Sequence, residues 1–326
     1  MVFQFEIMDI DSGGVEGGVE AVSPLTCRKW SVLEIKKIVT KWQQYKREEG
    51  YWNAVYIENH DHSRSVSRFG NDSPEWRALS AKLLAMLQTT QSGTLFVYQG
   101  EEIGMKNFPR SWGIEEYKDV ASINYWNQNR AFAVTRELEA RRKALGSGEV
   151  DMSDVLDAFQ RKARDHARTP VQWTQAPHGG FTTGTPWMRV NDDYEAWNVA
   201  SQLNDEQSVL HFWRDALKLR KDHEALVYGD FELIAPDHEQ LFAYTRSLDG
   251  VSILVLMNFG TSELPLEGLV SIEPSFHLVL SNYTAQQEGL YLGAQARVEY
   301  VQSGYIASSA HDLCSYLTVN AAEKYC

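Results

Sequence analysis

The sequence predicts an α/β protein with a parallel sheet, followed by a smaller antiparallel part. Three short apolar segments, residues 2–5, 54–57 and 94–98, have strand character, and segments with helical periodicity separate them. Each of the three ends abruptly in polar residues. Strands that alternate with helices pair in parallel through right-handed crossovers, which is typical of part of a parallel barrel or of a doubly wound sheet.

The intervening helices carry recognisable start signals. Ser31 and Glu34 have the S-x-x-E spacing of a capping box, in which each side chain satisfies a free backbone N–H group. A second helix is predicted to start at residues 73–75, where Pro stands in the first turn. A third is predicted to begin at Asn204 or Asp205, and residues 131–145 also show helical patches.

From about Val227 the composition turns to β. Residues 231–234, 241–247, 252–258 and 276–280 are strand candidates, and Asp249-Gly250 between two of them is typical of a type I′ hairpin. We therefore predict a first domain over residues 1–226 and a small antiparallel domain over residues 227–299. Residues 300–326 have no clear period, and we predict no structure for them.

Charge and cysteine content limit the possible partners. The net charge of −13 disfavours nucleic acid or an anionic membrane as a partner and suits a neutral substrate such as a sugar. Cys27, Cys314 and Cys326 form neither a disulfide framework nor a zinc spacing, which favours a reducing compartment. The N-terminus lacks the features of a signal peptide, and no stretch is long enough to span a bilayer. We expect a cytoplasmic protein without a cofactor.

The strongest candidate site follows the strand at residues 54–57. There the chain changes to Glu58-Asn59-His60-Asp61-His62, and barrel enzymes carry their chemistry on loops at the carboxyl ends of strands. Two other interpretations stay open. The segment can be a polar turn, because Asn and Asp are turn formers. It can also hold a metal through His60 and His62, although the sequence offers no obvious second half of such a site.

A long segment rich in Pro, Gly and Trp follows residue 161. A loop of this length in a compact domain is usually functional or disordered, and its aromatic content favours order. We predict that it packs over the site. Arg164 and Arg168 flank Asp165 here, and the alternative role for Arg164 is a structural ion pair with a neighbouring carboxylate.

Five motifs in this order carry a family resemblance: FQFEIMDIDSG, ENHDHSRSVSRFGND, YQGEEIGM, RDHARTPVQW and GFTTGTPWMRVN. Over about residues 2–298 the sequence resembles the α-glucosidases of glycoside hydrolase family 13, in particular the fungal maltase and isomaltase (oligo-1,6-glucosidase) group. The resemblance implies a (β/α)8 barrel with a C-terminal β-sandwich. It also implies hydrolysis, with retention, of terminal α-1,4 or α-1,6 glucosidic bonds in small glucosides of the maltose and isomaltose type.

The resemblance also implies which part of the barrel is present. Residues 2–5 look like strand six, residues 54–57 like strand seven and residues 94–98 like strand eight. The nucleophile Asp after strand four and the acid/base Glu after strand five are then absent, so we expect this chain to be inactive alone. We also expect self-association through the exposed barrel edge. The alternative is a non-catalytic carbohydrate-binding or scaffold protein derived from the barrel.

Within the motifs, the resemblance assigns roles to four residues. Asp61 is the third acid, which binds ring hydroxyls and favours the distorted sugar of the transition state. His60 donates to a neighbouring hydroxyl, and Asn59 either orients the loop or is structural. Arg164 closes the non-reducing end; its usual Asp partner belongs to the other barrel half, so we expect it to be unpaired here. Ala121 stands where relatives commonly carry an acidic residue near the aglycone subsite.

Overall fold

The computed structural model describes residues 1–302 except 14, 17–18, 21–26, 46–48, 132–151, 273–275, 284–290 and 293–296. Nearly all of the helix expected at residues 131–145 lies outside the described residues. The same holds for residues 303–326, which include Cys314 and Cys326.

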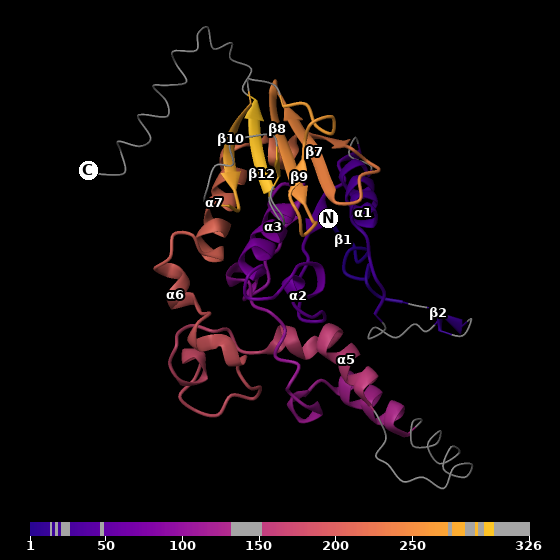
Figure 1. The fold of residues 1–326 in the computed structure, drawn as a ribbon, viewed down its shortest axis with the longest axis vertical. Coiled ribbons are helices and arrows are strands. Elements are labelled where there is room, and N and C mark those ends of the chain that lie inside the picture. Colours follow the sequence, from indigo (N-terminus) through magenta and orange to yellow (C-terminus); the bar gives the residue numbers. More distant parts are fainter. Residues whose placement is uncertain are drawn as a thin grey trace.

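Figure 1 shows the arrangement of the elements, with an orange and yellow sheet at one end and α5 at the other. The helices are α1 (Val32–Gln44), α2 (Ser65–Phe69), α3 (Arg77–Thr89), α5 (Ser153–Lys162), α6 (Val199–Leu203), α7 (Val209–Asp222) and α8 (Ala225–Tyr228), and residues 120–131 are also helical. Short 3-10 helices are η2 (Glu101–Ile103), η3 (Ile114–Glu116), η4 (Arg164–Arg168), η5 (Pro177–Gly180) and η6 (Asp192–Glu195). The strands are β1 (Val2–Phe3), β2 (Val15–Glu16), β3 (Val19–Glu20), β4 (Asn53–Val55), β5 (Thr94–Leu95), β6 (Asp230–Ile234), β7 (Leu241–Leu248), β8 (Val251–Asn258), β9 (Leu264–Pro265), β10 (Phe276–Ser281), β11 (Tyr291–Leu292) and β12 (Arg297–Gln302).

A three-stranded parallel sheet in the order β1-β4-β5 confirms the predicted strand–helix–strand pattern. Each strand is shorter than predicted, because the chain leaves the sheet early. The carbonyl of Phe5, which we placed in the first strand, accepts the N–H of Asp9 at 2.9 Å in a helical turn. One residue beyond β5, the N–H of Phe96 still donates to the carbonyl of Val55, the last residue of β4, at 2.9 Å.

The capping box of α1 is confirmed. Ser31 Oγ accepts the N–H of Glu34 at 3.3 Å, and Glu34 Oε2 accepts the N–H of Ser31 at 2.9 Å. This exchange satisfies two backbone donors that the first helical turn leaves free.

Two other helix starts were placed too early. Residues 73–76 form a turn, and α3 begins at Arg77. Ser208, not Asn204 or Asp205, caps α7, because residues 199–203 form the separate helix α6, which ends at Asn204.

A five-stranded antiparallel sheet, β10-β12-β8-β7-β6, forms the C-terminal part, and β9 pairs with β11 beside it. Asp249 and Gly250 have φ angles of 49° and 81°, which confirms the predicted turn with two left-handed residues. Strand β12 ends at Gln302, three residues beyond the boundary that we expected.

Strands β7 and β8 are buried on both faces of this sheet, and alternating residues of β7 serve the two sides. Phe242 and Tyr244 join a core with Ile35 of α1 and Leu87 of α3. The opposite face packs in a second core; its buried members are Leu241, Ala243, Leu254, Leu256, Leu264, Leu266 and Val270. The C-terminal sheet is therefore attached to the side of the parallel sheet that the helices cover, which we call its outer side.

Lys36 of α1 makes a polar contact in the same interface. Its ammonium group donates to the carbonyls of Ala235, Pro236 and His238 at 2.7, 3.2 and 2.6 Å. Burial lowers the pKa of Lys36 to about 8, and the charge of Asp237 partly opposes that shift.

The other side of the parallel sheet exposes apolar side chains. In the described part of the chain, β1 pairs with β4 alone, which leaves an open edge. Phe3 and Phe5 are 46% and 50% exposed, although their rings contact Tyr56 at 5.3 and 6.0 Å between centroids. Phe3 also lies 4.8 Å from the ring of Phe96, which is 37% exposed, whereas Tyr56 between them is buried.

We predict that Ser31→Ala lowers the free energy of unfolding by about 1 kcal/mol, because α1 loses a side-chain cap. A lower midpoint in urea unfolding would show this. The control is Thr261→Ala in an exposed bend. Equal midpoints for the two variants would contradict the role of the cap.

Candidate active site

Loops from the carboxyl ends of the three parallel strands contact one another. Arg68 of α2, which follows the β4 loop, donates to the carbonyl of Met8 and to Asp11 in the loop after β1. Arg64 of the β4 loop donates to the carbonyl of Gln99 after β5 at 2.8 Å. Two buried arginines therefore connect the three loops.

A buried ion pair closes the loop after β4. Arg64 Nη1 lies 3.1 Å from Glu58 Oε2, and both side chains are almost fully buried. The other carboxylate oxygen of Glu58 accepts the N–H and the hydroxyl of Ser65, both at 2.7 Å. Because a buried charge without its partner is strongly destabilising, this pair fixes the loop ends and leaves residues 59–61 projecting, with the side chains of His60 and Asp61 exposed.

Asn59 orders the projecting segment. Its Oδ1 accepts the N–H of Asp61 at 2.8 Å and lies 2.8 Å from Nδ1 of His62. A side-chain oxygen that caps the backbone two residues on is the usual turn-forming role of Asn. The polar-turn interpretation therefore describes Asn59, while the side chains of Asp61 and His60 are exposed.

The two histidines of the segment have different partners. His60 Nε2 lies 3.2 Å from Asp61, whereas His62 lies 3.7 Å from Asp9 in the loop after β1. Burial, together with the charges of Arg68 and Lys162, lowers the pKa of His62 to about 4, although Asp9 opposes this. Among the described residues, no group of three or more His, Cys, Asp or Glu side chains could hold a metal ion.

Arg164 is not unpaired, which corrects our expectation. Asp61 Oδ1 accepts Arg164 Nη1 and Arg168 Nη2, each at 3.1 Å. A second carboxylate, Asp119, lies on the other side of both guanidinium groups. Sequence reasoning noted Arg168 without assigning it a role and missed Asp119. The spacing of Arg164 and Arg168 within one helical turn was an available signal, but none marked Asp119.

The exposure of the cluster decides which groups can meet a ligand. The side chains of His60 and Asp61 are 70% and 42% exposed, whereas that of Asp119 is only 4% exposed. An ionised carboxylate accepts hydrogen bonds and a guanidinium group donates them. The exposed side of the cluster can therefore bind hydroxyl groups with both kinds of partner.

His166 supports η4 from the protein interior. Its Nδ1 accepts the N–H of Phe108 at 3.3 Å, so the proton lies on Nε2, which donates to the carbonyl of Phe159 at 2.9 Å. Burial lowers the pKa of His166 to about 3. The neutral ring thus holds the segment that carries Arg164 and Arg168.

Two glutamates after β5 are structural. Glu101 is buried, accepts hydrogen bonds from Gln88 and from the N–H of Tyr98, and has its pKa raised well above the usual value by burial and by Glu58. Glu102 accepts the N–H of Gly100 at 2.7 Å. Neither contacts the Asp61 cluster.

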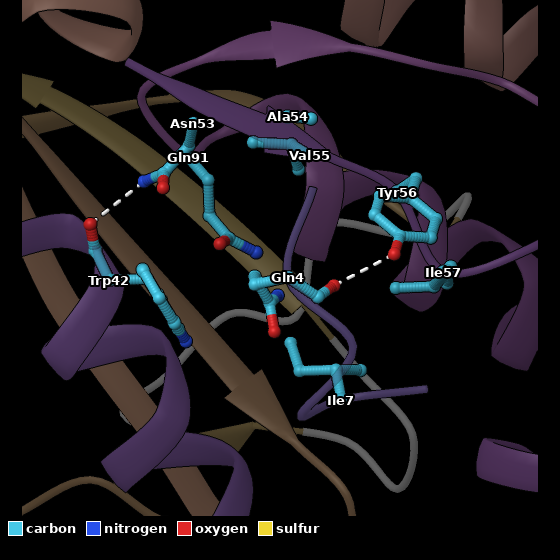
Figure 2. A pocket seen from close by; sticks show the side chains of 9 residues that line it. All are labelled: Gln4, Ile7, Trp42, Asn53, Ala54, Val55, Tyr56, Ile57 and Gln91. Atoms are coloured by element: carbon cyan, nitrogen blue, oxygen red, sulfur yellow. Dashed lines mark hydrogen bonds between the residues drawn. The ribbon is translucent and has the colours of Figure 1, made fainter. Parts of the chain in front are cut away.

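A small cavity lies away from this cluster, on the sheet itself. Figure 2 shows it between Trp42 of α1 and the β4 residues Asn53, Ala54 and Val55, with Gln4 on another side. Its volume of about 10 Å³ suits at most one water molecule. A sugar ring cannot enter it, so it does not compete with the Asp61 cluster as a substrate site.

A parallel strand–helix sheet with ionisable side chains gathered at the carboxyl ends of its strands is typical of barrel enzymes. Residues 1–229 match the catalytic domain of the alpha-amylase family. The chain therefore belongs to this family, glycoside hydrolase family 13, which confirms the resemblance seen in the motifs.

Similar proteins share names that agree with this assignment. The chain is 37% identical over 294 residues to an α-glucosidase of Schizosaccharomyces pombe, covering 87% of this chain and 46% of that protein. It is 39% identical over 291 residues to an oligo-1,6-glucosidase of Parageobacillus thermoglucosidasius, covering 88% of this chain and 47% of that protein. The chain thus spans about half the length of the curated relatives it matches.

Solved structures agree on the fold. The structure of trehalose-6-phosphate hydrolase from Bacillus licheniformis matches with a TM-score of 0.76 at 32% identity, over 92% of this chain and 50% of that one.

In the described residues, no helix combines the length and apolar character needed to cross a membrane.

We predict that His166 makes stability depend on pH. Its folded pKa of about 3 lies below the unfolded value of 6.5, so the stabilisation is complete above about pH 6.5 and is lost as the pH falls toward 3. The slope is at most about 1.4 kcal/mol per pH unit. His166→Gln should show a shallower decline of the urea midpoint between these pH values.

The control for this prediction is His178→Asn, because His178 is exposed and Asn tolerates its positive φ of 58°. This variant should follow the wild-type pH dependence. Parallel curves for His166→Gln and wild type would show that another group causes the acid sensitivity.

Proposed function

We propose that this chain provides the sugar-binding part of an α-glucosidase. The reaction is hydrolysis, with retention, of terminal α-1,4 or α-1,6 glucosidic bonds in maltose- and isomaltose-type oligosaccharides. The observation that carries the proposal is the exposed Asp61 carboxylate, which two arginines hold at the strand ends in a chain whose relatives are named α-glucosidase and oligo-1,6-glucosidase. A cytoplasmic location, which the cysteine pattern favours, belongs to the same proposal.

In this proposal Asp61 accepts hydrogen bonds from two ring hydroxyls. Bonds of this kind accelerate the reaction only where they strengthen in the transition state, as the ring flattens toward an oxocarbenium ion. His60 Nε2, now 3.2 Å from Asp61, turns to donate to a neighbouring hydroxyl. Arg164 binds the outer hydroxyls at the non-reducing end, and Asn59 keeps the turn in shape.

Retaining hydrolysis needs two further carboxylates about 5 Å apart, one as nucleophile and one as acid and then base. Asp119 is a poor candidate, because it is buried and engaged by two guanidinium groups. Glu101 is buried and holds its own loop. We infer that the nucleophile and the acid/base lie outside these 326 residues, so the chain alone does not hydrolyse glucosides.

The assignment of the three parallel strands to a barrel is part of the same proposal. We infer that β1, β4 and β5 are strands six, seven and eight of a (β/α)8 barrel. Residues 1–226 then belong to the barrel and residues 227–299 to a β-sandwich domain. The parallel order β1-β4-β5 and the family match over residues 1–229 support this division.

The alternative function is carbohydrate binding or scaffolding without catalysis. The observation that favours it is the engagement of both oxygens of Asp61, one by two arginines and the other by His60. A site of this kind can exchange protein contacts for sugar hydroxyls without any reaction.

Hydrolysis of p-nitrophenyl α-glucoside tests the proposal. We predict no turnover by the 326-residue chain and none by Asp61→Asn. A chimera that adds the half of the Schizosaccharomyces pombe relative that this chain does not match should hydrolyse the substrate. Asp61→Asn in that chimera should lower kcat/KM by at least about a hundredfold, or about 2.7 kcal/mol of transition-state stabilisation.

The matched control is Asp157→Asn in the chimera, since Asp157 lies in an exposed pair with Arg110. It should leave kcat/KM unchanged. A folded chimera that binds glucosides without turnover would favour the non-catalytic alternative. Turnover by the chain alone would show that one of its own carboxylates is the nucleophile.

We also propose that the chain self-associates through the open edge of β1, where backbone groups and exposed aromatic rings lie together. Phe3→Ser should lower the average mass in sedimentation velocity. Phe181→Ser is the control, because Phe181 is 49% exposed but lies on the loop around η5. Equal masses for the two variants, or a monomeric wild type, would contradict this contact.

A further inference from the structure

We propose that Asp119 is a positioning residue for sugar binding. It holds the guanidinium groups of Arg164 and Arg168 in place, so that Asp61 and Arg164 can exchange their mutual contact for contacts with a glucose ring. This role rests on the proposed function of the Asp61 site and adds to it a residue that does not touch the sugar.

The two carboxylates of the cluster are used differently. Asp119 gives one oxygen to each arginine: Oδ1 accepts Arg164 Nη2 at 2.8 Å and Oδ2 accepts Arg168 Nη1 at 2.5 Å. Asp61 uses the single oxygen Oδ1 for both arginines, at the longer distance of 3.1 Å. Shorter contacts and a nearly complete burial make Asp119 the fixed side of the cluster, and Asp61 the side that can exchange.

Asp119 is itself held by the backbone around it. Its Oδ1 accepts the N–H of Ala121 at 2.9 Å and that of Ser122 at 3.4 Å, where the helical residues 120–131 begin. Its own N–H donates to Asp165 at 2.8 Å, and Asp165 also accepts the N–H of Lys118 at 2.6 Å. Asp165 lies on η4 between the two arginines. The segment around Asp119 therefore both accepts hydrogen bonds from η4 and donates hydrogen bonds to it.

The charge of Asp119 is secured by these contacts. Burial alone would raise the pKa of its carboxyl group, but the hydrogen bond from Arg164, the N–H of Ala121 and the charges of both arginines lower the pKa below its usual value. The carboxylate therefore stays ionised at neutral pH and keeps two charge-assisted hydrogen bonds.

A sugar that binds to Asp61 must displace a protein contact. One of its neutral hydroxyls must take the place of a guanidinium contact on Asp61 Oδ1. With Asp119 present, both arginines keep a partner during that exchange. Without it, Asp61 is the only carboxylate left in the cluster, and the two guanidinium groups then compete with the sugar for its Oδ1.

The test is a titration of the 326-residue chain with methyl α-glucoside, followed by NMR with resolved arginine side-chain N–H signals. We expect Asp119→Asn to bind about tenfold more weakly than wild type. Before any ligand is added, the Nε–H signals of Arg164 and Arg168 should shift in this variant. These shifts report that Asp119 holds both guanidinium groups, and weaker binding by a variant that remains folded reports that this contact serves the sugar. Asp119→Glu, which keeps the charge, should recover part of the affinity, and Asp157→Asn should behave as wild type.

The outcomes separate this role from the proposed function. Wild-type binding that Asp61→Asn abolishes and Asp119→Asn leaves unchanged overturns the role of Asp119 alone. A wild-type chain that does not bind methyl α-glucoside overturns the proposed function, and this role falls with it. If the Asp119 variants do not fold, Arg168→Gln removes the second partner of Asp119, and unchanged affinity in that variant overturns the proposal.

Discussion

The buried pair of Arg64 and Glu58 is the contact on which the site depends. Neither charge can stay buried without the other, so the pair fixes both ends of the loop after β4. The same guanidinium group donates to the carbonyl of Gln99 and lies 3.4 Å from that of Ala167 on η4. One side chain thus ties together the loop after β4, the loop after β5 and the segment that carries Arg164 and Arg168.

The ion pairs around Arg64 and Glu58 range from fully buried to exposed. Glu58 and Arg64 are buried and serve the fold, whereas Asp61 and His60 are exposed and can meet a ligand. Asp119 lies between these extremes, buried but paired with two partly exposed arginines. Such a gradient lets the outer contacts exchange while the inner ones hold, which is what a site for neutral hydroxyl groups requires.

Local patterns in the sequence predicted the parts of the fold that depend on neighbouring residues. The capping box at Ser31 and the left-handed turn at Asp249-Gly250 follow from short-range rules, and the parallel pairing follows from the alternation of strands and helices. The start of α7 was misplaced because α6 takes up residues that looked like a cap. Asp119 was missed because its partner Arg168 is 49 positions away, and no periodic pattern marks a contact at that distance.

The location of the hydrophobic core explains how a chain that spans about half the length of its relatives can form the Asp61 cluster. The main core lies between α1, α3 and the C-terminal sheet, on the outer side of the parallel strands. The inner side contributes little to that core, since Phe3, Phe5 and Phe96 remain exposed. The Asp61 cluster is held by loop-to-loop hydrogen bonds and not by the inner side of the sheet. Its geometry therefore does not require a closed barrel, whereas a retaining reaction needs a second and a third carboxylate that a neighbouring strand end would have to supply.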